Sequence, residues 1–113
     1  QANASILKYN DENALSCVIS LAYYSAQKNY TLHREMPAGK GFADIVFEPN
    51  RNCDLPALIV ELKWGHSAEE AVEQIKQKDY LDCLKNYSGE VLLVGVNYDK
   101  EKRHTCRIER AVI

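Results

Sequence analysis

The pattern of apolar and polar positions predicts a helix followed by three strands in the first part of the chain. Residues 11–28 follow possible N-cap side chains and repeat apolar residues every three or four positions, which is the period of a helix with one buried face. The expected buried stripe of this helix is Leu15, Val18, Ile19 and Ala22. Residues 30–36, 41–48 and 57–64 have the composition and the flanking turn residues of strands.

The second part of the chain predicts one more helix and two more strands. Ser67 and Glu70 form a capping-box pattern, which predicts a helix from there to about residue 86. Its expected apolar face contains Ala71, Val72, Ile75 and Leu84. Strands follow at 90–98 and 104–108. Because a helix connects the strands at 57–64 and 90–98, these two should pair in parallel through a right-handed crossover. The expected fold class is α/β, an αβββαβ core whose mixed central sheet is flanked by helices.

Charged side chains stand at the end of the strand predicted for residues 57–64. Glu61 and Lys63 are two residues apart and therefore share one face of that strand, where burial is costly without compensation. If this strand pairs with the preceding one symmetrically about the proline-bounded loop at 49–56, Asp44 lies opposite Glu61. Two carboxylates so placed repel each other, whereas a divalent cation would bind both through oxygen. The pattern therefore predicts a metal site.

The composition adds few constraints. The 113 residues are 46% hydrophobic, carry a net charge of −2 and contain no stretch near the ~18 apolar residues of a membrane helix. We expect one domain over residues 1–113, in the cytoplasm, and a piece of a longer chain because it begins at Gln1. The four cysteines lack zinc-ligand spacing, which favours core packing without a disulfide framework. The basic tail is either a solvated face or a phosphate-binding surface: Lys100, Lys102, Arg103, His104, Arg107 and Arg110.

The predicted order of elements and several motifs resemble the PD-(D/E)XK, or restriction-endonuclease-like, nuclease superfamily. The similarity covers essentially the whole chain and rests on His33-Arg34-Glu35, Gly39-Lys40-Gly41-x-Ala43-Asp44-Ile45, Val60-Glu61-Leu62-Lys63-Trp64, Ala71-x-x-Gln74-Ile75 with Lys78 and Tyr80, and Leu93-Val94-Gly95. Together these motifs resemble the branch found at the C-terminus of bacterial proteins with an AAA-ATPase-like N-terminal region. Two positions depart from the pattern. Phe42 replaces an expected arginine, and Lys78 replaces the tyrosine of exonuclease relatives.

The resemblance implies metal-dependent phosphodiester hydrolysis of nucleic acid, with DNA as the expected substrate and Mg²⁺ or Mn²⁺ as the cofactor. It implies that Asp44 and Glu61 hold the metal, while Lys63 orients or activates the attacking water and steadies charge on the phosphate. Glu12, near the start of the first helix, and Gln74, in the second, would be further residues of the site. An ATPase-like N-terminal domain in the full-length chain is the implied protein partner.

Three functions stay open on the sequence alone. The first is a nuclease, and the second is a catalytically silent nucleic-acid-binding or regulatory module attached to an ATPase domain. The third is a structural domain in which Glu61 and Lys63 form a salt bridge. Individual residues also have plainer interpretations: Gln74 as a rim amide, Glu12 as a helix-dipole residue, and Trp64 as a core or rim side chain. DNA versus RNA, attack at ends or within strands, and oligomeric state are open as well.

Overall fold

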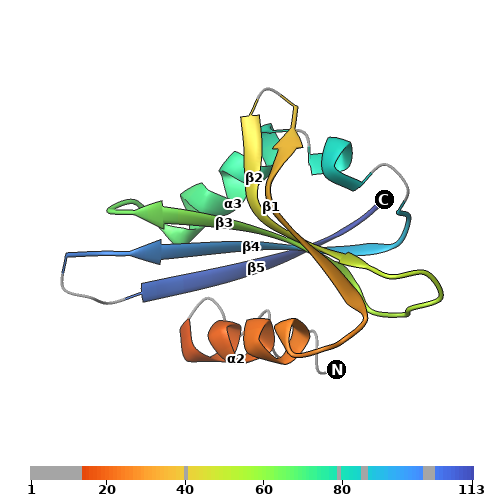
Figure 1. The fold of residues 1–113 in the computed structure, drawn as a ribbon. Coiled ribbons are helices and arrows are strands. Elements are labelled where there is room, and N and C mark those ends of the chain that lie inside the picture. The colour runs from red at the N-terminus through yellow and green to blue at the C-terminus, as the bar shows by residue number, and fades with distance from the viewer. Residues whose placement is uncertain (1–13, 40, 79, 85–86, 101–103) are drawn as a thin grey trace.

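The structure is a computed structural model, and it describes residues 14–39, 41–78, 80–84, 87–100 and 104–113. Its elements are α2 (Ala14–Ser25), β1 (Tyr30–Ala38), β2 (Gly41–Pro49), β3 (Ala57–Trp64), α3 (Ala68–Gln77), the 3-10 helix η1 (Tyr80–Leu84), β4 (Glu90–Tyr98) and β5 (His104–Val112) (Figure 1). This order confirms the predicted α/β class and αβββαβ core, with β5 as the predicted last strand.

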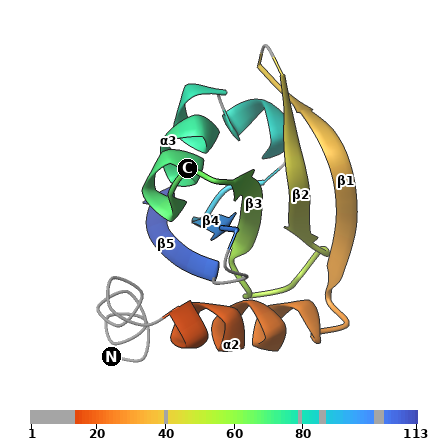
Figure 2. The same cartoon turned by 90° about the vertical axis from the view of Figure 1, so that its left-hand side faces the viewer.

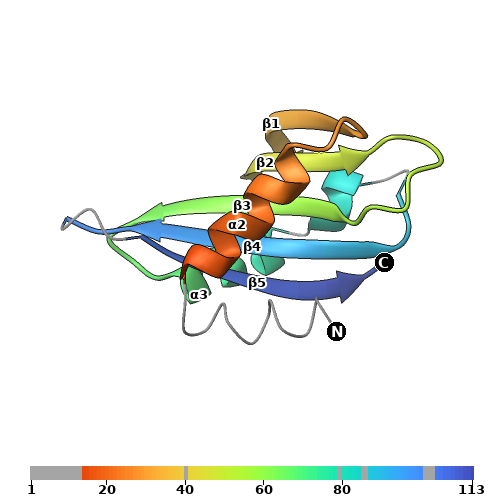
Figure 3. The same cartoon turned by 90° about the horizontal axis from the view of Figure 1, so that it is seen from below.

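One five-stranded sheet in the order β1-β2-β3-β4-β5 forms the centre of the fold. β3 and β4 pair in parallel, as the connection through α3 predicts, and the other neighbours are antiparallel. Figure 2 shows α2 on one face of the sheet and α3 on the other, and Figure 3 shows α2 crossing the strands obliquely. Each face of the sheet packs into its own apolar cluster. Within the described residues, no helix has the length and apolar character to cross a membrane.

The central strands follow the sequence pattern closely. β3 occupies Ala57–Trp64, as predicted, and its first five residues are buried. Its pairing with β2 joins Ile45 to Val60, Val46 to Ile59 and Phe47 to Leu58. These pairs confirm the predicted register, which is symmetric about the loop between β2 and β3. The register holds because both strands carry apolar side chains that a shift of one residue would turn to the wrong face.

The prediction for the buried face of the first helix is wrong for the two predicted residues whose side chains are described. Ile19 is 59% exposed and Ala22 is exposed, while Leu15 and Val18 are not among the described side chains. The residues that face the sheet are instead Cys17, Ser20, Leu21 and Tyr24. This second stripe also has helical spacing, so the sequence alone permitted both. The helix ends at Ser25, three residues before its predicted end.

The second helix is shorter than predicted, and two strands are longer. α3 starts after the N-cap Ser67, whose hydroxyl accepts a hydrogen bond from the Glu70 backbone N–H at 3.0 Å, but it ends at Gln77. The chain then turns through η1, and this turn buries Leu84 against the hairpin of β1 and β2. β1 continues to Ala38, where it pairs with Gly41 of β2. β5 continues to Val112 because it pairs with β4 along the whole length of both strands.

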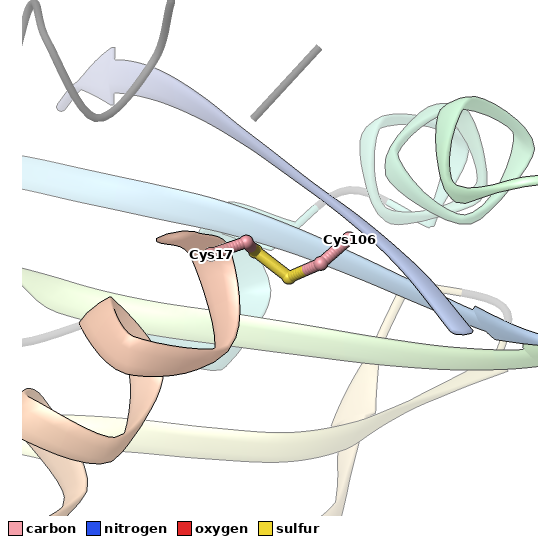
Figure 4. The surroundings of a disulfide bond; sticks show 2 residues. All are labelled: Cys17 and Cys106. Atoms are coloured by element: carbon pink, nitrogen blue, oxygen red, sulfur yellow. A yellow bond between two sulfur atoms is a disulfide. The ribbon is translucent and has the colours of Figure 1, made fainter. Parts of the chain in front are cut away.

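A disulfide joins Cys17 of α2 to Cys106 of β5, with a Cα–Cα distance of 5.6 Å (Figure 4). The expectation that the cysteines serve only core packing is therefore wrong for this pair. The two cysteines are 89 positions apart, so no local spacing in the sequence marks them as partners. Their pairing follows from the packing of α2 across the sheet. Cys83 is buried, as expected for a cysteine that packs in the core.

Candidate functional site at the end of β3

Glu61 is the most unusual residue of the sheet, because its carboxylate is almost completely buried. The residue is 3% exposed, and its Oε2 accepts a hydrogen bond from Lys78 Nζ at 3.0 Å. Its second oxygen, Oε1, is buried and has no hydrogen-bond partner among the described residues. Burial raises the pKa of the Glu61 carboxyl above its ordinary value. The hydrogen bond from Lys78 opposes that rise, and the nearby Asp44 carboxylate adds to it.

Asp44 lies where β2 separates from its neighbours. The β2–β3 ladder ends at the pair Ile45–Val60, one position before Asp44 would meet Glu61. Asp44 Oδ2 instead accepts a hydrogen bond from the Leu62 backbone N–H at 2.7 Å. The Asp44 side-chain oxygen thus replaces the backbone carbonyl oxygen that a continued β2–β3 ladder would supply. It accepts the hydrogen bond of a strand N–H that would otherwise lack a partner. The bond holds Asp44 beside Glu61, as the sequence predicted.

A backbone irregularity on the other side of β2 accompanies this separation. The β1–β2 ladder joins Arg34 to Ile45 and Met36 to Ala43, but it omits the pair that Glu35 and Asp44 would form. Glu35 has a φ of 52°, a left-handed conformation that is uncommon for glutamate. Figure 2 shows β1 curving away from the rest of the sheet. Because neither ladder includes Asp44, this residue lies outside the regular strand pairing.

A cleft of about 510 Å³ lies between the end of β3 and α3. The sequence-predicted residues Lys63 and Gln74 both line it, together with Gly41, His66, Glu70, Glu73, Gln77 and Lys78. Lys63 makes no hydrogen bond or salt bridge within the part of the chain that the structure describes. The predicted alternative of a Glu61–Lys63 salt bridge is therefore absent there, and Glu61 pairs with Lys78 instead. Glu12, the remaining predicted site residue, lies outside the described residues.

Sequence reasoning missed two residues that shape this site. Lys78 reaches Glu61, and its position four residues after Gln74 on a helical pattern could have placed it on the same side. Asn97 is 6% exposed, and its Oδ1 accepts a hydrogen bond from the His66 backbone N–H at 2.9 Å. This bond fixes the turn between β3 and α3 and hence the start of the helix that forms one wall of the cleft. Asn97 ends an apolar run, which is the one sequence signal it offers.

The residues at this site fit a divalent cation held with the help of substrate. No group of three or more His, Cys, Asp and Glu side chains within the described ranges is arranged to hold a metal. Two carboxylates are nevertheless present, and one of them has an oxygen without a partner. Mg²⁺ is commonly bound by one or two carboxylates that are completed by water and phosphate oxygens. An orphaned, buried carboxylate oxygen is the kind of ligand that such an ion would satisfy.

Two arginines of the basic tail pair with neighbouring glutamates. Arg110 Nε lies 2.6 Å from Glu90 Oε2, and Arg107 lies 3.7 Å from both Glu69 and Glu109. Lys102 and Arg103 lie outside the described residues. The ion pairs favour the interpretation of this segment as a solvated face.

Comparison with known proteins gives one match. The model of a family described as the PD-(D/E)XK nuclease superfamily matches residues 10–108, which include every element of the structure except the end of β5. No curated protein and no solved structure matches the chain. The matched region contains Asp44, Glu61 and Lys63, so the family covers the cleft as well as the fold.

Proposed function

We propose that this chain, which belongs to the PD-(D/E)XK nuclease superfamily, hydrolyses phosphodiester bonds in nucleic acid, with DNA as substrate and Mg²⁺ or Mn²⁺ as cofactor. One observation carries the proposal. The buried Glu61 carboxylate lies near Asp44, and its Oε1 has no hydrogen-bond partner among the described residues. Its ion-pair partner Lys78 lines the same cleft as Lys63, whose ammonium has no ion-pair partner within the described ranges. Two acidic ligands and a cation beside one cleft are what the hydrolysis of a phosphodiester requires.

Each residue has a definite part in the proposed reaction. Asp44 and Glu61 would hold the metal, which supplies a more acidic water and neutralises charge on the phosphate. Lys63 follows Glu61 on the same face of β3, so its ammonium can orient the attacking water and stabilise the charge that develops on the phosphate oxygens. The Gln74 amide lines the same cleft and can hydrogen-bond either the water or a phosphate oxygen.

A second candidate function is a catalytically silent module that binds nucleic acid or regulates an attached domain. The observation in its favour is the ion pair between Lys78 and Glu61, which neutralises the carboxylate without a metal. A site of this kind could keep its acidic residues as structural elements alone. Metal binding without cleavage would support this second function over the first.

Cleavage assays with the wild type and a Lys63→Met variant test the proposal. The wild type is expected to cut plasmid or single-stranded DNA in Mg²⁺ or Mn²⁺ and to stop cutting in EDTA. Lys63→Met should cut at least ~10²-fold more slowly, because it loses a charge that acts on the transition state. Lys28→Met, at an exposed lysine between α2 and β1, is the matched control and should cut like the wild type. Undiminished cutting by Lys63→Met would contradict the proposed role of that residue.

The proposed metal site also predicts how metal changes the stability of the wild type relative to that of a Glu61→Gln variant. In EDTA, Glu61→Gln should raise the melting temperature by roughly 2–6 °C, on the order of 1 kcal/mol, because burial raises the pKa of this carboxyl and so disfavours its ionised form in the folded protein, while Lys78 is partly exposed and keeps its hydrogen bond to the Phe42 carbonyl oxygen. Saturating Mn²⁺ should stabilise the wild type and leave the variant unchanged. Thermal scans measure both effects, with Glu69→Gln, an exposed carboxylate of α3 that does not line the cleft, as control. A Glu61→Gln protein that is less stable than the wild type in EDTA would overturn the argument.

The wider setting of the domain is also a proposal. The motifs that resemble the AAA-ATPase-associated branch support an ATPase-like domain that precedes this one in a longer bacterial chain. A nuclease that acts on cellular DNA would work in the cytoplasm. Thiol reductants in that compartment would reduce the Cys17–Cys106 disulfide. Glu12 would add a further carboxylate from the start of the first helix. Mass spectrometry and sequencing of the native gene product would test the proposed longer chain.

A further inference from the structure

Lys78 is placed as a part of the site rather than as a surface charge. It caps the C-terminus of α3, where its backbone N–H donates to the carbonyl oxygens of Gln74 and Ile75 at 3.1 and 3.2 Å. Its ammonium donates to Glu61 Oε2 at 3.0 Å and to the Phe42 carbonyl oxygen at 2.6 Å. The side chain is 20% exposed and lines the cleft. The fold therefore brings three segments, β2, β3 and the end of α3, to one ammonium.

The space around Lys78 is shaped to admit this side chain. Gly41 starts β2, and a Cβ at that position would lie 3.6 Å from Lys78 Cε and 3.9 Å from its Cδ. The lysine stem thus packs along the strand in van der Waals contact and reaches the inner carboxylate. An ammonium has three donors, and two of them are used here. Within the described residues the third donor has no partner, and the side chain is open to a ligand in the cleft.

A cation beside Glu61 must interact unfavourably with a second cation bound by the same carboxylate. Two unit positive charges a few ångströms apart repel by several times the thermal energy, even at the effective dielectric constant of a protein surface. The Lys78 ammonium sits on a flexible four-carbon stem, so it can move when a stronger cation takes its place. Lys63 lies on the same side of β3 and has no ion-pair partner within the described residues. The two lysines therefore differ: one is engaged with the acidic residue and the other is not.

We propose that Lys78 is a second cation of this site, which neutralises Glu61 in the metal-free protein and turns to a phosphate oxygen of the nucleic acid when a divalent cation binds that carboxylate. The inference rests on the proposed function and deepens it, because it assigns a substrate contact to a residue outside the Glu-x-Lys motif. A purely structural ion pair makes a different prediction: its loss would lower stability and leave metal affinity and turnover unchanged.

Metal titration and cleavage of the Lys78→Met variant separate these alternatives. Removing the competing charge should tighten Mn²⁺ binding by roughly tenfold in isothermal titration calorimetry. The same variant should cut DNA at least ~10-fold more slowly at saturating metal, because a phosphate contact is lost. The matched control is Lys76→Met, since Lys76 lies on the same helix, pairs with Glu109 at 2.7 Å and does not line the cleft. It should match the wild type in both measurements.

The proposed role of Lys78 is therefore distinguished by two changes in one variant, a higher affinity for Mn²⁺ and a lower rate of DNA cleavage. Lys78→Gln, which keeps a hydrogen-bond donor and loses the charge, should repeat it even if the Met variant folds poorly. Mn²⁺ binding that weakens or stays the same in both variants, or cleavage that equals the wild type, would overturn the inference while the wild type still binds and cuts. A wild type that neither binds Mn²⁺ nor cuts DNA would overturn the proposed function, and this inference with it.

Discussion

Replacing Asp44 by Asn is expected to abolish metal-dependent cleavage of DNA in a protein that still folds. Asn keeps an oxygen that can accept the Leu62 backbone N–H, the bond that Asp44 Oδ2 makes at 2.7 Å. It removes the negative charge, which is the property a hard cation requires of its ligands. We expect the rate of cleavage to fall by roughly 10³-fold or more, because water activation and charge neutralisation depend on the same ion.

Three measurements make the Asp44 prediction sharp. Calorimetry should show that the variant loses Mn²⁺ binding, circular dichroism should show a folded protein, and a DNA cleavage assay should show the loss of rate. Asp54→Asn is the matched control, because Asp54 is an exposed aspartate in the loop between β2 and β3. Comparison with Asp44→Ala adds information, since Ala also removes the acceptor for Leu62 and should cost stability. Full activity of Asp44→Asn would contradict the proposed role of the Asp44 carboxylate in cleavage.

The central strands and their register could be predicted because several constraints in the sequence agree. An apolar run and a loop between Pro49 and Pro56 define the limits of β3 and the pairing of β2 with it. A shift by one residue would expose the buried residues of both strands, so only one register is compatible with the pattern. The closeness of Asp44 and Glu61 follows from that register alone. This half of the site could therefore be derived without any structure.

The orientation of α2 could not be predicted, because two apolar stripes of the same helix have equally good spacing. Ile19 is exposed, and Cys17 belongs to the stripe that packs on the sheet. The choice between the stripes depends on contacts with strands far along the chain, such as Cys106 on β5, 89 positions away. Local periodicity contains no information about such a partner. The missed disulfide and the wrong helix face therefore have one cause.

Lys78 escaped prediction for a related reason. Helical spacing from Gln74 indicates its side of α3, but its contact with Glu61 also depends on where α3 ends, and the sequence predicted a helix that continues to about residue 86. In the structure α3 ends at Gln77, and the cap residue Lys78 turns toward the sheet. The strength of the capping-box signal at Ser67 fixed the start of the helix, but no comparable signal marked its end. The position of Lys78, the second lysine of the site, depends on where this helix ends.

Gly95→Ala is expected to be among the most destabilising single substitutions in this chain, and to disable the site as well. Gly95 is the β4 neighbour of Glu61 in the parallel ladder, and α3 packs directly over it. A Cβ at this position would overlap the Ala68 carbonyl oxygen and lie 2.9 Å from Ala71 Cβ and Val72 Cγ2. The first of these is a backbone atom, so the strain cannot be relieved by a side-chain rotation.

The helix must therefore move away from the sheet when Gly95 is replaced. We expect a loss of about 3 kcal/mol and a fall in melting temperature of roughly 10 °C or more. Because α3 carries Gln74 and its cap residue Lys78 contacts Glu61, displacement of the helix should also move both residues away from the site and slow cleavage. Thermal and chemical unfolding, followed by a DNA cleavage assay below the melting temperature, measure the two effects.

Gly41→Ala is the matched control for Gly95→Ala, since it adds the same methyl group to another strand glycine of the same site. Its Cβ would meet only the flexible stem of Lys78, at 3.6 Å, which is an ordinary contact. The control should keep its melting temperature within a few degrees of the wild type and retain DNA cleavage. Equal stability of the two variants would contradict the close packing of α3 on β4. Since α3 and its cap residue supply most of the cleft lining, the result would also remove the geometric basis for assigning Gln74 and Lys78 to the site.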